Sequence, residues 1–143
     1  MRPNRSIPPS GVVPVLIYPD VRAAVAWLEG AFGFSERVRV GEHHRAQLVA
    51  GEGAVIVADV RSTRVAPSGG VATHLVMVRV DDAVAHCARA EAAGARVTDP
   101  VTDHVYGERQ YTVVDPWGHR WTFSQTLEDV LPEDWGGVSV GGS

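Results

Sequence analysis

The densest collection of groups able to contact a ligand lies between Val105 and Gln125. There Arg109 follows Tyr106 and precedes Tyr111. A guanidinium offers parallel N–H donors that fit a carboxylate or carbonyl, and the tyrosine rings offer stacking surfaces. If Arg109 points into a cavity, these side chains form a small-molecule site. An exposed hairpin arginine beside a surface tyrosine explains the same residues equally well.

Other reactive side chains favour structural roles. Nucleophilic catalysis needs a Ser, Cys or Thr with a base in reach, and no such pair stands out. Cys87, the single cysteine, is flanked by alanines like a residue on a buried helix face, so we expect a core residue rather than a reactive thiol. We expect His43 and His44 in a hairpin turn, His86 on the outer face of a helix and His119 bonded to backbone or solvent.

A closing hairpin is predicted to position the candidate ligand groups. Residues 109–115 alternate with the period of a strand, and Asp115-Pro116-Trp117-Gly118 has the composition of a tight turn. The strand 120–125 must then return antiparallel. On it Trp121 and Phe123 share one face and Thr122 lies on the other, which predicts a core on one side and a cavity wall on the opposite side.

Composition bounds the class of protein. With 143 residues and 45% hydrophobic content, the chain can bury about 70% of its unfolded surface, enough for one compact unit. The net charge of -4 and the lack of a basic run argue against nucleic-acid binding. No apolar run is long enough for a bilayer or a signal peptide, and one cysteine suits a reducing compartment. We therefore expect a cytoplasmic protein with no membrane partner.

The remaining pattern predicts the order βαβββ twice, an α+β fold. The expected strands are 12–18, 34–40, 45–50, 54–60, 74–80, 95–105, 109–115 and 120–126, and the expected helices are 21–32 and 83–93. Asp20 can cap the first helix, and either Asp81 or Asp82 the second. The expected organisation is an N-terminal mobile arm (1–11), a first module (12–60), a linker (61–72), a second module (73–127) and a C-terminal tail (128–143).

The repeat leads to a family resemblance. Asp20 to Gly33 and Asp81 to Gly94 are equally spaced, as expected of an internal duplication. Two βαβββ units with Tyr106-Gly107-x-Arg109 and then Asp115-Pro116-x-Gly118-His119-x-Trp121 resemble the vicinal oxygen chelate superfamily of glyoxalases, bleomycin-resistance proteins and extradiol dioxygenases. The hairpin is similar to that of the bleomycin-resistance-like or uncharacterised glyoxalase-like branch. The resemblance implies two tandem modules whose curved mixed sheets surround a cup, with the helices outside.

The resemblance also implies where a metal would lie. Metal-using members carry ligands on the first and last strands of each module, and the corresponding positions here are Val13, Val57, His74 and Thr122. If Asp20 is aligned with Asp82 instead of Asp81, Leu75 takes the place of His74 among these four positions. Even with Asp59 added, only two side chains suit a divalent ion, whereas a catalytic site needs about three. We therefore expect neither a metal nor a cofactor.

Three functions compete. The leading hypothesis is a metal-independent binding protein, a homodimer whose cup sequesters an aromatic or amphipathic small molecule such as an antibiotic. Its expected ligand contacts are Gln47, Val57, Asp59, His74, Tyr106, Arg109, Tyr111, Trp117 and Thr122. The alternative is a lyase, isomerase or dioxygenase that uses His74 and Asp59, either with a divalent metal and an unrecognised third ligand or as a metal-free acid and base. The third is a regulatory subunit whose own side chains fill the cup.

Overall fold

The computed structural model describes residues 1–141 as two βαβββ modules in tandem. The first module contains β1 (Val15–Ile17), α1 (Val21–Phe32), β2 (Ser35–Val40), β3 (Arg45–Ala50) and β4 (Gly53–Ala58). The second contains β5 (Val76–Arg79), α2 (Ala83–Ala92), β6 (Arg96–Asp103), β7 (Glu108–Val114) and β8 (Arg120–Thr126), and a short 3-10 helix (Pro132–Asp134) follows. The predicted α+β class is confirmed. The end of the predicted tail, 142–143, lies outside the described residues.

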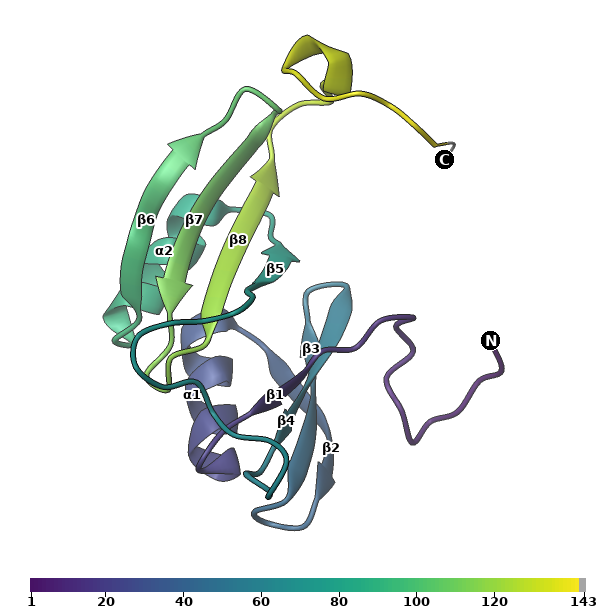
Figure 1. Cartoon of the computed structure of the whole chain (residues 1–143), viewed down its shortest axis with the longest axis vertical. Helices are drawn as coiled ribbons and strands as arrows, with labels where there is room; N and C mark the ends of the chain where they lie inside the picture. The colour runs from purple at the N-terminus through teal and green to yellow at the C-terminus, as the bar shows by residue number, and fades with distance from the viewer. Residues whose placement is uncertain (142–143) are drawn as a thin grey trace.

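Each module forms its own mixed sheet. The orders are β1-β4-β3-β2 and β5-β8-β7-β6, and in both the first strand pairs parallel with the last while the other pairs are antiparallel. The sheets do not close into a barrel. Figure 1 shows the second sheet above the first, with α2 behind the second sheet. One face of each sheet packs on helices, and the opposite one is called here the open face.

The residues of the closing hairpin alternate between two opposite faces, as the period-2 pattern predicts. Tyr111, Val113, Trp121 and Phe123 have no exposed surface and belong to the core on the helix side. Thr122 pairs across the strands with Thr112 on the open face. Aromatic burial on one face thus holds the hairpin against the helices and leaves hydroxyl groups on the other.

The helix caps resolve the alignment of the two modules. Asp20 accepts from the backbone N of Ala23, and Gly33 ends α1 with φ 77°. In the second module Asp82, not Asp81, accepts from the backbone N of Ala85. Asp20 of the first module therefore corresponds to Asp82 of the second. The alignment based on equal spacing, which pairs Asp20 with Asp81, is wrong by one residue at this position.

Contacts within one chain hold the modules together. Trp27 Nε1 donates to the Ala93 carbonyl at 2.8 Å, which ties α1 to the end of α2. The Tyr18 hydroxyl donates to the Asp115 carboxylate of the second module at 2.6 Å. Both contacts join the two modules of the same chain.

Candidate functional site

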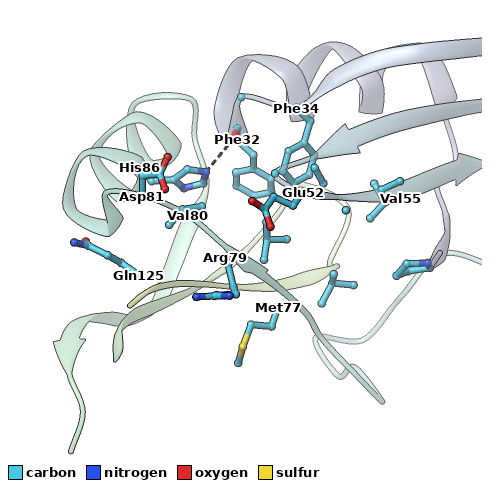
Figure 2. A pocket seen from close by; sticks show the side chains of 18 of the residues that line it. Phe32, Phe34, Glu52, Val55, Met77, Arg79, Val80, Asp81, His86 and Gln125 are labelled. Carbon is cyan, nitrogen blue, oxygen red and sulfur yellow. Dashed lines mark hydrogen bonds between the residues drawn. The ribbon is translucent and has the colours of Figure 1, made fainter. Parts of the chain in front are cut away.

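An open groove of about 900 Å³ runs between the two modules. It is bounded by the end of α1, the β3–β4 hairpin tip and β5. Figure 2 shows Phe32, Phe34 and Glu52 on the side of the first module, facing Met77 and Arg79 of β5. The volume lies in the range of small-molecule sites in proteins.

Apolar side chains form the floor of the groove. Phe32 and Phe34 lie edge to face at 5.6 Å between ring centroids, and both also pack on Trp121. Val55 and Val78 complete this lining from β4 and β5. The floor is therefore a continuation of the aromatic core, which offers a ligand apolar contact without exposing a flexible surface.

Polar groups stand around the apolar floor. Glu52, Arg79, Asp81 and Gln125 all line the groove. Two of them are fixed by neighbours, since Arg79 Nη2 donates to Thr126 Oγ1 at 2.9 Å and Gln125 Oε1 accepts from the backbone N of Ala83 at 2.9 Å. A few oriented polar groups around an apolar floor are typical of sites that bind amphipathic molecules.

His86 lines the groove and has both ring nitrogens occupied. Its Nε2 lies 3.0 Å from the Phe32 carbonyl oxygen, which can only accept, so Nε2 carries the proton and Nδ1 accepts from the Tyr111 hydroxyl. Burial lowers the pKa of the imidazole and raises that of Tyr111. The expected place on the outer face of α2 is wrong, because these two partners and the Phe123 ring hold His86 inward.

The open face of the second sheet carries a row of hydroxyl and amide groups. The Thr112 and Thr122 hydroxyls bond at 2.7 Å, and Tyr106 donates to Gln110 Oε1 at 2.9 Å. Gln110 in turn donates to Ser124 Oγ at 3.0 Å. Tyr106 and Thr122, both predicted to contact a ligand, therefore lie on one polar face, with their hydroxyls bonded to protein partners.

Two predicted ligand groups are engaged in ion pairs. Arg109 Nε donates to Asp103 at 2.6 Å, and this contact lowers the pKa of Asp103. Asp59 accepts from Arg64 at 2.8 Å and from Arg61 at 3.1 Å, and the hydrogen bond from Arg61 is the largest cause that lowers its pKa. The structure therefore places these two charges at separate surface ion pairs.

Three other predicted contacts lie in or against the core. Val57 and Tyr111 are fully buried on the helix side, opposite to the face predicted for them. Trp117 packs edge to face against Tyr18 at 5.4 Å between ring centroids. The Cys87 thiol is buried as predicted, and burial raises its pKa to about 11.

The last two predicted contacts lie in different modules. His74 precedes β5 and bonds Thr73, while Leu75 is the residue that the Asp82 cap aligns with the first module. Gln47 lies on the open face of the first sheet under the N-terminal arm, where it donates to the Ser6 carbonyl at 2.8 Å. None of the nine predicted contacts lines the groove. The expected strands 45–50 and 54–60 imply a hairpin with its tip between them, but nothing in the sequence indicated that this tip meets β5.

The donor set does not fit the metal centre that the resemblance implied. Among the positions that the resemblance assigns to metal ligands, Val57 lies in the core and Thr122 is hydrogen-bonded to Thr112. Across residues 1–141 no group of three His, Cys, Asp or Glu side chains is close enough to hold an ion. A valine and a hydroxyl-bonded threonine supply no ligands for a divalent cation.

The fold and sequence place the chain in a known family. A model of the Glyoxalase/Bleomycin resistance protein/Dioxygenase superfamily matches residues 12–123, and the chain belongs to that superfamily. The crystal structure of TioX from Micromonospora sp. ML1 is 36% identical, covers 85% of this chain and 100% of that chain, and superposes with a TM-score of 0.69. A glyoxalase/bleomycin resistance protein/dioxygenase family enzyme from Burkholderia phytofirmans PsJN shares the fold at 20% identity and a TM-score of 0.68, covering 80% of this chain and 97% of that one.

Shorter matches come from mycobacteria. The uncharacterized proteins Mb0911c of Mycobacterium bovis and Rv0887c of Mycobacterium tuberculosis are each 38% identical over 60 residues, or 42% of this chain. The match covers 38% of the first protein and 34% of the second, so the chain spans about a third of the length of these curated relatives. Separately, no helix within residues 1–141 has the length and apolar character needed to cross a membrane.

Proposed function

We propose that the protein binds a small aromatic or amphipathic molecule, without a metal, in the groove between its modules. The observation that carries this proposal is the groove of about 900 Å³ with an aromatic floor and a polar surround. Burial of an apolar ligand against Phe32 and Phe34 supplies the affinity. Glu52 and Arg79, which carry opposite charges, orient the polar part of the ligand.

The side chains favour binding over turnover. Both nitrogens of His86 are engaged, so the one histidine of the groove is not free to move a proton. The Cys87 thiol, with a pKa of about 11, is protonated at neutral pH and a poor nucleophile. Sequestration of an antibiotic in resistance is the role we infer, and the family description includes bleomycin-resistance proteins.

Two further parts of the proposal concern assembly and location. Val15 and Leu75 are large apolar side chains, each more than two-fifths exposed, and a second copy of the chain would cover them in a homodimer. Light scattering at several concentrations tests this part. The cytoplasmic location follows only from the sequence and stays a prediction.

The binding experiment compares the protein before and after treatment with a chelator. Both samples are titrated with 1-anilinonaphthalene-8-sulfonate and with a panel of aromatic antibiotics, and metal content is measured by mass spectrometry. We expect one saturable site for each chain and the same affinity in both samples. A stoichiometric metal whose removal abolishes binding, or turnover that stops with the chelator, would establish the metal-dependent enzyme instead.

A further inference from the structure

His86 joins the two modules at the edge of the groove. It lies on α2, and its Nε2 donates to the Phe32 carbonyl at the end of α1 at 3.0 Å, a bond drawn in Figure 2. Its Nδ1 accepts from the Tyr111 hydroxyl of β7. Because Phe32 and His86 both line the groove, the imidazole belongs to the wall that a ligand contacts.

The imidazole ring packs among aromatic side chains. The Phe32 ring stacks on it at 6.0 Å between ring centroids, and the Phe123 ring lies at 4.1 Å. His86 is nevertheless only half-buried, so water still reaches the ring. An aromatic ligand that lies on Phe32 covers the neighbouring imidazole and removes this water.

Charged and titratable groups surround His86 on several elements. On α2, Arg89 donates to the Gly30 carbonyl at 2.8 Å and to the Glu29 carbonyl at 3.1 Å, which holds a positive charge beside the same end of α1. Burial is the largest effect on the pKa of the imidazole and lowers it, the hydrogen bond to Phe32 opposes this, and Arg89 adds to the lowering. The other such groups are Tyr111 of β7, Cys87 and Glu91 of α2, and Glu52, Arg79 and Asp81 of the groove.

A second proton on the ring changes the wall of the groove. It binds Nδ1, which then donates to Tyr111, and the tyrosine hydroxyl has to turn from donor to acceptor. The bond from Nε2 to the Phe32 carbonyl is possible in both states, so the modules stay joined. The difference is a cation beside the apolar floor, and a neutral ligand that covers this cation has to remove its water at a cost in free energy.

From these contacts we propose that His86 couples ligand binding in the groove to pH. A neutral aromatic ligand binds the chain whose imidazole is neutral, and proton uptake at Nδ1 releases the ligand. The proton comes from solvent and stays on the ring, so the coupling is a binding equilibrium and not a catalytic step. By linkage, the ligand lowers the proton affinity of His86 by the factor by which the proton lowers the affinity for the ligand. This inference rests on the function proposed for the groove.

Titration of the full chain with N-phenyl-1-naphthylamine, followed by the fluorescence of the dye, tests the coupling. The dye is aromatic and stays uncharged across the pH range used, so only the protein titrates. We expect the Kd to be constant from pH 8 to pH 6.5, the ordinary pKa of histidine. As the pH falls through the lower pKa of His86, the Kd should rise about tenfold, because the binding-competent fraction of the chain declines.

His86→Gln removes the titrating group and keeps the possibility of both hydrogen bonds, since an amide N–H donates and an amide oxygen accepts. We expect its Kd for the dye to be the same at pH 8 and pH 5, whatever its absolute value. His104→Gln is the matched control. His104 is also half-buried and stacked on a ring, that of Tyr106 at 5.0 Å between centroids, but it does not line the groove. This variant should lose affinity at low pH as the natural chain does.

An NMR titration of the histidine ring signals measures the reciprocal effect. Saturating dye should lower the proton affinity of His86 about tenfold, the same factor as in the fluorescence titration. It should leave the titration of His104 unchanged. A merely structural histidine would show neither agreement between the two factors nor a response to the dye.

Dye binding at pH 8 separates the coupling from the function proposed for the groove. If the chain does not bind the dye at pH 8, both are wrong. If it binds, but the Kd and the proton affinity of His86 are unchanged wherever circular dichroism shows a folded chain, the coupling alone is wrong. The coupling is also overturned if His86 stays neutral until the chain unfolds in acid, or if His86→Gln keeps the pH dependence.

Discussion

The Tyr18 hydroxyl donates a 2.6 Å hydrogen bond to the Asp115 carboxylate, and the two residues are 97 positions apart. Asp115 is 4% exposed and also accepts from Trp121 Nε1 at 3.2 Å. The backbone N–H groups of Trp117 and His119 donate to its other oxygen at 3.0 Å. One buried carboxylate thus shapes the β7–β8 turn and fastens it to the first module.

Removal of this carboxylate should destabilise the whole chain. We expect Asp115→Ala to lower the free energy of unfolding by about 3–5 kcal/mol, because it leaves several buried donors unpaired. Tyr18→Phe removes one donor to a charged group and should cost about 1.5–3 kcal/mol. Urea unfolding at neutral pH, followed by tryptophan fluorescence, measures both values.

Tyr106→Phe is the matched control for Tyr18→Phe. Its hydroxyl bonds the neutral Gln110 side chain at a half-buried site within one module, so the loss should stay near 1 kcal/mol or below. If the two tyrosine variants unfold at the same urea concentration, Asp115 does not fasten the modules.

The features of this fold that follow from the sequence are local and periodic. Period-2 alternation separated Trp121 and Phe123 from Thr122, and the structure confirms that they lie on opposite faces, with Trp121 and Phe123 in the core. Adjacent Asp81 and Asp82 are chemically identical as caps, so only the observed hydrogen bond could decide between them. That one-residue difference then decides whether His74 or Leu75 corresponds to Val13 of the first module.

Contacts between distant segments could not be predicted in the same way. Glu52 and Arg79 lie in different modules and line the same groove, which forms where α1 packs on α2. His86 has a helical position that periodicity alone leaves ambiguous, and its inward direction depends on the Phe32 carbonyl of the other module. A single sequence contains no signal for such pairs, so it did not indicate the groove.

Gly107 is the glycine at which substitution should be most costly. It has φ 84°, and an added Cβ would lie 2.5 Å from the Glu128 carbonyl oxygen and 2.9 Å from Val130 Cγ2. Because backbone must move to relieve this contact, we expect Gly107→Ala to lower stability by about 3 kcal/mol or more. The midpoint of thermal unfolding measures the effect.

Gly94→Ala isolates the backbone part of that cost. Gly94 has a similar φ of 94°, yet nothing lies within 4 Å of its added Cβ. Only the strain of a positive φ remains, about 1–2 kcal/mol. Equal losses in the two variants would show that the C-terminal segment moves away from Gly107 freely.

His86 should make the stability fall as the pH is lowered. Burial lowers the pKa of His86 in the folded chain below its ordinary value of 6.5. The unfolded chain therefore binds a proton first, so stability is fully present above pH 6.5 and is lost as the pH falls from there through the folded pKa. We expect His86→Gln to flatten the thermal midpoint between pH 7 and pH 5.

His43→Gln provides the comparison for this pH dependence. His43 is exposed in the β2–β3 turn, so its removal should leave the slope between pH 7 and pH 5 unchanged. A slope that survives in His86→Gln would assign the dependence to other groups.

Met77→Trp should narrow the groove without disturbing the core. Met77 lines the groove from β5 and is 56% exposed, so a larger side chain is accommodated at little cost in stability. A ligand that lies between β5 and the hairpin tip then loses room, and we expect the affinity for 1-anilinonaphthalene-8-sulfonate to fall about tenfold, which corresponds to about 1.4 kcal/mol. Val84→Trp is the matched control, since Val84 is similarly exposed, at 54%, on α2 but does not line the groove. Equal dye affinity in the two variants, with unchanged thermal midpoints, would place the ligand outside the groove.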